Sequence, residues 1–176
     1  MIRRTHRIRK IYFLLFLFFI SCGYYSFTKE SLPGIKTVAI PMFDNQTLEY
    51  GISESLTDSL VNAFISDNTL KVVNEKVADS VLRGKITKYE RIAHTYDEDE
   101  NVEEYKVRIF LEVSFEDKKH KKTIWERKDM EGWGVYSAIP LTTSTGTDSL
   151  ETEDLGKARA IKKLTDDILN KTVKGW

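Results

Sequence analysis

The stretch VEEYKVRIFLEVSFE, residues 102–116, alternates apolar and polar side chains over most of its length. Successive side chains of a β-strand point to opposite faces, so this alternation is typical of a strand with one buried face. The predicted buried set is Tyr105, Val107, Ile109, Leu111, Val113 and Phe115. The opposite set is Lys106, Arg108, Glu112 and Ser114, with Phe110 as an apolar exception. The stretch therefore predicts a sheet that packs on one face and meets solvent or a partner with the other.

Further strands are predicted on both sides of this stretch. VLRGKITKYERIAHTY, residues 81–96, is separated from it by the acidic segment DEDEN, residues 97–101, which indicates a long hairpin. DKKHKK, residues 117–122, predicts a second turn, and TIWERKDMEGWGVY, residues 123–136, is compatible with one more strand ending at Gly132 to Gly134. The sequence leaves open whether this strand forms. TTSTGTDS, residues 142–149, predicts a loop.

The segment before the hairpin predicts a strand, a helix and a strand. IKTVAIPMF, residues 35–43, is rich in β-branched residues, and Pro41 must end this strand or confine it to a sheet edge. A helical period predicts a helix over 52–67 that stops at Asn68, with an apolar face of Ile52, Leu56, Leu60, Val61, Phe64 and Ile65. LKVV, residues 70–73, predicts a short strand. This order favours a right-handed crossover and parallel pairing of the two strands.

A second helix is predicted near the end of the chain, over about residues 152–173. Its apolar positions are Leu155, Ala158, Ile161, Leu164, Ile168 and Leu169. Acidic residues near its start and Lys171 and Lys174 near its end complement the helix dipole. The predicted fold class is α+β: two helices on one face of a small mixed, mainly antiparallel sheet, in the order β-α-β-β-β-(β)-α.

The first 21 residues have the three parts of a secretory signal. A basic segment, residues 1–10, precedes an apolar run over residues 11–20, and the small residue Ser21 follows. The apolar run has ten residues, whereas a membrane-spanning helix needs about 20, so a permanent transmembrane helix is the weaker interpretation. The predicted organisation is a signal peptide over 1–21, a lipidated N-terminus and tether over 22–34, and a single domain over 35–176.

Composition excludes several classes of function. From residue 22 onward the chain has 22 basic against 27 acidic residues, which argues against nucleic-acid binding. No HExxH, GxSxG, P-loop or dinucleotide motif occurs, and His6, His94 and His120 lack the spacing of metal ligands. The acidic run 97–100 lacks the glycine and the distal glutamate of a calcium loop, so it is predicted to be a solvated hairpin tip. We expect no catalytic site, no metal and no cofactor.

Two regions are candidate contact sites. The densest basic run after residue 21 consists of Lys118, Lys119, His120, Lys121 and Lys122, and its charges could neutralise the phosphates of a lipid or an anionic sugar. The alternative interpretation of this run is a solubilising turn. Tyr24, Tyr25 and Phe27, beside the only cysteine, could lie at a membrane interface or pack against the domain.

The only cysteine, Cys22, directly follows Phe19-Ile20-Ser21, and these four residues resemble a bacterial lipobox. A lone cysteine in an exported chain cannot form an internal disulfide, which favours modification. The resemblance implies a covalent lipid on Cys22, and Gly23 is permissive for passage to the outer membrane.

Several short motifs stand out between residues 22 and 90: Cys22-Gly23-Tyr24, Leu32-Pro33, Ile40-Pro41, Phe43, Asn45, Thr47, Leu56-Thr57, Ala78-Asp79 and Leu82-Arg83-Gly84. Through these motifs, residues 22–90 resemble the LptE family of lipopolysaccharide-assembly lipoproteins. The resemblance implies a non-catalytic lipoprotein on the periplasmic face of the outer membrane, which forms a complex with an LptD-type β-barrel and assists lipopolysaccharide transport.

An alternative stays open at this point. The opening VAIPMFDNQT, residues 38–47, followed by LTDSLVNAF, residues 56–64, also resembles ring-forming secretion-pore lipoproteins of the curli or exopolysaccharide type.

Overall fold

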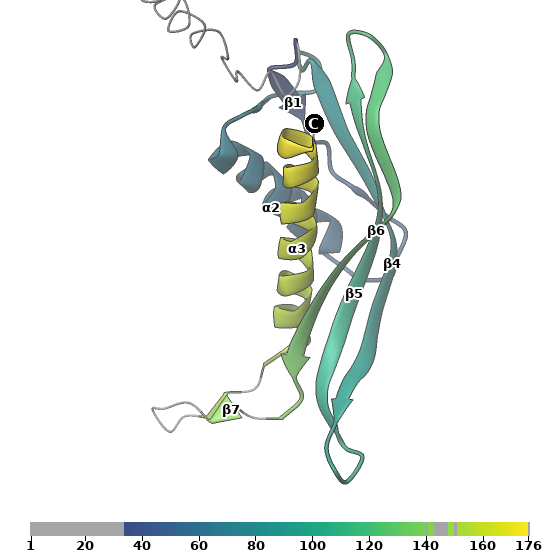
Figure 1. Cartoon of the computed structure of the whole chain (residues 1–176), viewed down its shortest axis with the longest axis vertical. Helices are drawn as coiled ribbons and strands as arrows, with labels where there is room; N and C mark the ends of the chain where they lie inside the picture. Colours follow the sequence, from purple (N-terminus) through teal and green to yellow (C-terminus); the bar gives the residue numbers. More distant parts are fainter. Residues whose placement is uncertain (1–33, 140, 143–147, 150, 176) are drawn as a thin grey trace, which may run out of the picture. The chain divides into compact units, whose positions relative to one another are not determined.

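Three long antiparallel strands form the centre of the fold: β4 (Ser80–Tyr96), β5 (Val102–Asp117) and β6 (Lys122–Ser137) (Figure 1). The computed structural model describes residues 34–139, 141–142, 148–149 and 151–175. The hairpin predicted over 81–116 is confirmed, and the strand that the sequence left open forms as β6. The described strands of this sheet do not close into a barrel.

Short strands extend the sheet on the side of β4. β1 (Thr37–Ala39) pairs in parallel with both β3 (Lys71–Val72) and β4, and β2 (Asp44–Asn45) pairs in parallel with β4. The strand order is β3-β1-β4-β5-β6. The predicted parallel pairing is confirmed. The single strand predicted over 35–43 is wrong in extent, because β1 ends at Ala39, two residues before Pro41.

The helix α2 (Ile52–Asp67) has the predicted bounds. Asn68 ends it in the left-handed conformation, with φ of 58°, and donates its N–H to the carbonyl of Phe64 over 3.0 Å. The buried residues of its predicted apolar face are Ile52, Leu56, Leu60 and Phe64. Ile65 was wrongly placed on that face, since its side chain is 59% exposed.

The second helix, α3 (Glu153–Lys174), covers the same face of the sheet as α2, so the predicted architecture of two helices on one face is confirmed (Figure 1). Ile161, Leu164 and Ile168 are buried as predicted, but Leu155 is 37% exposed and Ala158 is exposed. The first turns of α3 bury Gly156 and Ala160 instead. There the helix meets β6 so closely that the smallest residues, not the most apolar ones, face the sheet.

Two glycines of β6 permit this close approach. A Cβ on Gly132 would lie 2.5 Å from the carbonyl oxygen of Ala160, and one on Gly134 would lie 2.6 Å from the Cβ of Arg159. We call the contact of Gly132 and Gly134 with residues 156–164 of α3 the glycine seam. The prediction that β6 ends at these glycines is wrong, because they continue the strand and receive the helix.

Replacing Gly134 with Ala is expected to lower the free energy of unfolding by about 1–3 kcal/mol, since the new methyl group would overlap the backbone of α3. Chemical denaturation measures this value. Val135→Ala, at the next position and on the opposite face, is the control and should cost less than about 1 kcal/mol. Equal stability of Gly134→Ala and the unchanged chain would contradict the seam.

The segment between β6 and α3 differs from the predicted loop over 142–149. β7 (Leu141–Thr142) pairs antiparallel with β8 (Asp148–Ser149), so the two ends of that segment form a small separate sheet. Thr142 suits a strand, but Asp148 does not, so composition gave no signal for this pairing. Residues 143–147 lie outside the described residues. Among the described helices, neither is long and apolar enough to cross a membrane.

The carboxylate of Asp79 fastens the start of β1 to β4. It accepts hydrogen bonds from the N–H of Lys36 over 3.1 Å, the N–H of Thr37 over 3.0 Å and the hydroxyl of Thr37 over 2.7 Å. The Thr37 hydroxyl also accepts the N–H of Asp79 over 2.8 Å. The hydrogen bond from the Thr37 side chain is the main reason why the pKa of Asp79 is lowered.

Asp79→Asn is expected to destabilise the domain at pH 7, and the difference from the unchanged chain should shrink in acid. Because the pKa of Asp79 is lower in the folded chain than its unfolded value of about 3.9, its stabilisation is complete above that value and is lost as pH falls through the folded pKa. Unfolding free energies at pH 7 and at about pH 3 measure this. A difference that is the same at both pH values would contradict the role of the ionised carboxylate.

Candidate functional site

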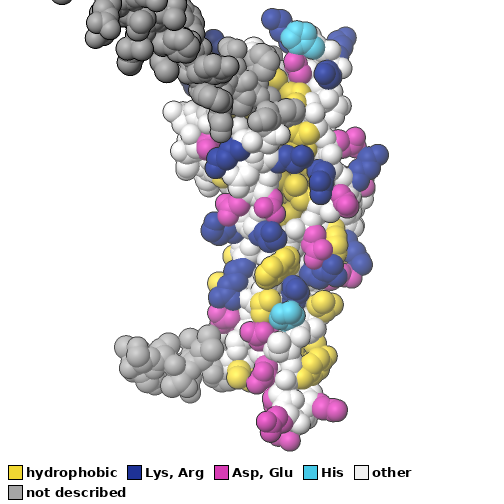
Figure 2. Space-filling view, viewed as in Figure 1, with side chains coloured by type: hydrophobic (Ala, Val, Ile, Leu, Met, Phe, Trp, Pro, Cys, Tyr) yellow, Lys and Arg dark blue, Asp and Glu magenta, His cyan; other side chains and the backbone are white. Residues whose placement is uncertain are grey.

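The basic turn, which we define as residues 118–122, joins β5 to β6 at one end of the sheet. It contains the four lysines predicted as a candidate binding site, Lys118, Lys119, Lys121 and Lys122, and all four are exposed. Figure 2 shows Lys, Arg and His side chains gathered at this end of the molecule. The structure therefore brings the four predicted residues together on one solvent-facing tip.

Residues next to the turn fix its conformation. The carboxylate of Asp117 accepts the N–H of His120 over 2.9 Å and lies 2.6 Å from its Nδ1. This contact with His120 is the main cause of the lowered pKa of Asp117, so its carboxylate stays ionised. Lys121 has a φ of 51°, a left-handed conformation that closes the turn. The turn is therefore held by the side chain of Asp117, the residue that precedes it.

One of the four lysines is tied to the body of the domain. The N–H of Lys118 donates to the carbonyl of Asp79 over 2.9 Å, and its ammonium group donates to the carbonyl of Glu75. Within the described part of the chain, the ammonium groups of Lys119, Lys121 and Lys122 make no ion pair. These three are available to an anionic ligand, while Lys118 positions the turn.

Sequence reasoning missed a further cation at this end. The N–H of Lys36 donates to the carboxylate of Asp79, whose backbone carbonyl accepts from Lys118. The side chain of Lys36 is exposed. Lys36 precedes the basic turn by 82 positions in the sequence. Only the pairing of β1 with β4 brings this lysine to the same end of the sheet, so no local sequence pattern could reveal it.

The opposite end of the sheet carries the acidic turn, residues 97–101 (Figure 2). The carboxylate of Asp97 accepts a hydrogen bond from the side-chain amide of Asn101 over 3.1 Å and from the N–H groups of Asp99 and Asn101 over 2.9 and 2.8 Å. The hydrogen bond from the Asn101 side chain is the main reason why the pKa of Asp97 is lowered. Asp97 is thus used to build the turn, as predicted for a hairpin tip. Among the described residues, no group of His, Cys, Asp or Glu is placed to hold a metal ion.

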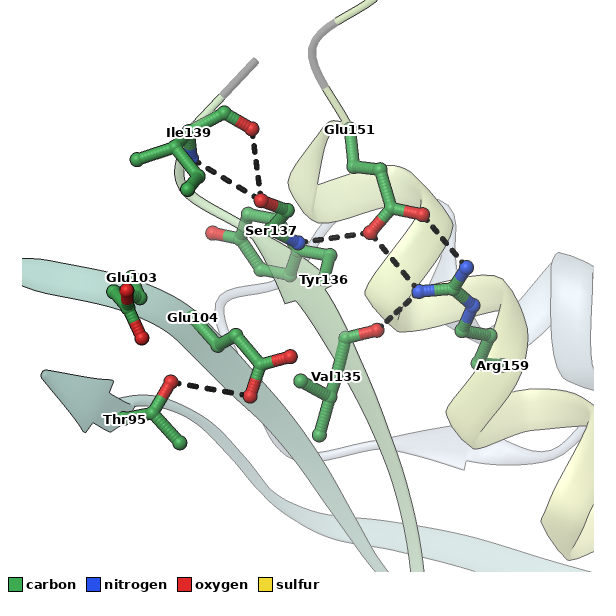
Figure 3. Close-up of a pocket in the computed structure, with 9 residues that line it drawn as sticks. All are labelled: Thr95, Glu103, Glu104, Val135, Tyr136, Ser137, Ile139, Glu151 and Arg159. Atoms are coloured by element: carbon green, nitrogen blue, oxygen red, sulfur yellow. Dashed lines mark hydrogen bonds and ion pairs between the residues drawn. The ribbon is translucent and has the colours of Figure 1, made fainter. Parts of the chain in front are cut away.

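A hollow of about 590 Å³ opens where β5 and β6 meet the segment before α3 (Figure 3). The carboxylate of Glu151 accepts two hydrogen bonds from the guanidinium of Arg159, over 2.7 and 3.1 Å, and the N–H of Ser137 over 2.8 Å. The hydrogen bonds from Arg159 are the main reason why the pKa of Glu151 is lowered. The lining residues are Thr95, Glu103, Glu104, Val135, Tyr136, Ser137, Ile139, Glu151 and Arg159.

The charges of this hollow do not suit a phosphate. The lining contains three carboxylates, those of Glu103, Glu104 and Glu151, but one guanidinium, that of Arg159. An anion entering the hollow would meet a net negative lining. Of the two places, the basic turn is the one whose electrostatics fit an anionic ligand.

Other predicted residues lie elsewhere or outside the described part. Cys22, the signal segment 1–21, and Tyr24, Tyr25 and Phe27 lie outside the described residues. His94 lies in β4 near the acidic turn, and His120 lies in the basic turn at the other end of the sheet. The structure therefore does not bring these two histidines together.

The model of a family named LptE and described as lipopolysaccharide-assembly matches residues 35–172. No curated protein matches the chain.

Solved structures share the fold at low identity. A hypothetical protein from Chlamydia trachomatis is 10% identical, with a TM-score of 0.53 over 81% of this chain and 99% of that one. A minor lipoprotein from Acinetobacter baumannii is 15% identical, with a TM-score of 0.51 over 80% of this chain and 92% of that one. A PelC dodecamer from Paraburkholderia phytofirmans gives a TM-score of 0.46 at 15% identity, over 78% and 88% of the two chains, and is too distant to bear on how this chain assembles.

Proposed function

Since the chain belongs to the LptE, or lipopolysaccharide-assembly, family, we propose that it is a non-catalytic outer-membrane lipoprotein that assists the transport and assembly of lipopolysaccharide. The family match over residues 35–172 is the observation that carries the proposal. It extends well beyond residue 90, where the resemblance of individual motifs ends.

The proposed organisation has three parts. Residues 1–21 are the signal peptide, residues 22–34 form the lipidated N-terminus and tether, and residues 35–176 form the periplasmic domain. Covalent lipid on Cys22 holds the protein to the periplasmic face of the outer membrane. No metal or other cofactor takes part in the proposed function.

The basic turn is the proposed contact with lipopolysaccharide. The ammonium groups of Lys119, Lys121 and Lys122 stand together on an exposed tip and form no ion pair with the described residues, and phosphates are the anionic groups that such a cluster neutralises. Lys118 anchors this tip through Glu75 and Asp79 and belongs to the site as its support.

Replacing Lys119, Lys121 and Lys122 with Glu is expected to weaken lipopolysaccharide binding about ten- to hundredfold. Each exposed charge contact contributes up to about 1 kcal/mol, and about 1.4 kcal/mol is a factor of ten in affinity. Titration of purified lipopolysaccharide into the domain over residues 35–176 measures the effect. Lys118 is kept so that the turn retains its contact with Glu75.

The matched control changes the same number of charges elsewhere. Lys128, Lys162 and Lys163 lie on β6 and α3, away from the basic turn. Their replacement with Glu should leave binding within about threefold of the unchanged chain if local charge, not net charge, decides affinity. If both triple variants weakened lipopolysaccharide binding equally, the basic turn would be only a solubilising turn and not a binding site.

The partner is tested by a native pull-down from detergent-solubilised outer membrane, with a tag placed after Trp176. The proposal expects one large β-barrel of the LptD type at constant stoichiometry. A homo-oligomer without a barrel would favour the alternative of a ring-forming secretion-pore lipoprotein.

A further inference from the structure

Within the part of the chain that the structure describes, residues 88–96 of β4 form an unpaired sheet edge, which we call the free edge. β1 and β2 together pair with β4 only between Ser80 and Ile86, and the last hydrogen bond on that side runs from the N–H of Gln46 to the carbonyl of Ile86 over 2.9 Å. Among the described residues, no backbone hydrogen bond reaches residues 88–96 from the side away from β5. Figure 1 shows this half of β4 at the rim of the sheet.

This edge lacks the protection that the opposite edge has. On β6, the guanidinium of Arg159 donates to the carbonyl of Val135, and the pairing with β5 is irregular beside the charged run 126–129. Such features keep an edge from pairing with other chains. On β4, pairing with β5 is regular from Lys88 to Ala93.

The charged side chains of this stretch of β4 are also engaged elsewhere. Lys88 forms an ion pair with Glu90 over 2.6 Å. The guanidinium of Arg91 lies 3.8 Å from the centre of the Tyr105 ring and donates to the hydroxyl of Tyr136 over 2.5 Å. These contacts hold the charges over the two faces of the sheet, which leaves the backbone edge accessible.

A pocket of about 380 Å³ lies at the head of the free edge. One wall is the segment before α2, and the other is the first part of the free stretch of β4. The lining residues are Gln46, Thr47, Leu48, Glu49, Thr87, Lys88 and Tyr89.

The segment that forms the first wall is held in place by its own hydrogen bonds. The side chain of Asn45 donates to the carbonyl of Glu49 over 2.9 Å and accepts the N–H of Thr47 over 2.9 Å. The N–H of Glu49 donates to the hydroxyl of Thr47 over 3.2 Å. Yet Leu48 and Tyr50 are fully exposed, so a rigid segment presents two large apolar side chains to solvent.

We propose that an extended segment of a partner protein adds to the sheet along residues 88–93 of β4 and packs an apolar side chain against the exposed Leu48 at the rim of the pocket. Strand addition gains affinity from main-chain hydrogen bonds and specificity from pockets for alternate side chains, and this site offers both. The rigid wall lowers the entropy lost on binding. The site is separate from the basic turn and does not depend on lipopolysaccharide binding.

A second copy of this chain fits the edge poorly. Two-fold antiparallel pairing of β4 with itself must place residues of the same face opposite each other. The two registers that use most of residues 88–93 are centred on Glu90 or on Arg91, and each puts two like charges directly opposite. Like charges in that position are destabilising, so the expected occupant is a different polypeptide.

Photocrosslinking in cells that produce the full chain tests this proposal. A benzophenone amino acid replaces Lys88, Glu90 or Ile92, one at a time, and Ile65 on α2 is the control position. The expected result is that all three edge positions react with one segment of one partner protein. Moving the probe by two residues along β4 should move the crosslinked site by about two residues along that segment, as for paired strands. Position 65 should not react with that segment.

Three outcomes would overturn the proposal: adducts between two copies of this chain, adducts scattered over unrelated segments, or no adducts from the three edge positions.

A second variant tests the pocket without disturbing the fold. Leu48→Asp should reduce crosslinking from position 92 about tenfold or more, since it removes a buried apolar contact from the complex. The matched change Ile65→Asp should leave the yield unchanged.

Lipopolysaccharide titration of Leu48→Asp separates this inference from the proposed function. Binding should equal that of the unchanged chain, because the pocket is not part of the basic turn. Crosslinking that is unaffected by Leu48→Asp would show that the pocket takes no part in strand addition.

Discussion

Replacing Ile109 with aspartate is expected to leave the domain unfolded under conditions in which the unchanged chain is folded. Ile109 is 0% exposed and lies in β5, the strand that pairs with both β4 and β6. A carboxylate at this position would be buried without a partner, which costs several kcal/mol, and the lost apolar burial adds about 1.5–3 kcal/mol. This is a large share of the roughly 5–15 kcal/mol that stabilises a domain.

The same change on the helix side should have the same outcome, because Leu164 is also 0% exposed and faces the glycine seam. Ile92→Asp is the control, since Ile92 is 41% exposed on the outer face of β4 and should lose about 1 kcal/mol or less. Far-ultraviolet circular dichroism and thermal melting measure the result. A cooperative melt of Ile109→Asp near that of the unchanged chain would mean that the buried face is assigned wrongly.

The second large effect is expected from Cys22→Ala, which should move the exported protein from the membrane fraction to the soluble fraction. Each buried CH₂ of an acyl chain contributes about 0.8 kcal/mol, so one chain binds a membrane reversibly and two or more hold it firmly. Without the thiol no chain can be attached. The change in membrane partitioning should therefore exceed a factor of about a thousand.

Fractionation of cells and the mass of the mature N-terminus measure this change. Ser21→Ala is the matched control, because it keeps a small residue before Cys22 and should leave the protein with the membranes. If Cys22→Ala stayed in the membrane fraction as a cleaved chain without lipid, another part of the chain would be the anchor.

The parts of the fold with a strong local pattern could be predicted from the sequence. Strict alternation identified β5, a helical period identified α2, and Asn68 marked its end. The glycine seam could not be predicted, since glycine usually interrupts strands, and its role in β6 depends on a helix that follows 20 residues later. For the same reason the first turns of α3 were assigned the wrong face.

The candidate site was predictable only where it is local. The four lysines of the basic turn are adjacent in sequence, so their clustering needed no tertiary information. The contacts that support them come from Glu75 and Asp79, about 40 positions earlier, and follow from the pairing of β4 with β5. The free edge of β4 was likewise invisible, because nothing in the strand itself says how far its neighbours extend.

The glycine seam also determines how the domain carries mechanical load. With backbone against backbone at Gly134 and Gly156, a slide of α3 by one turn, about 5.4 Å along its axis, would force neighbouring side chains into the space of the glycine hydrogens. Sliding of α3 along β6 is therefore sterically resisted at this contact. A pull on α3 is expected to load β6 first and β5 after it, because α3 packs most extensively on β6.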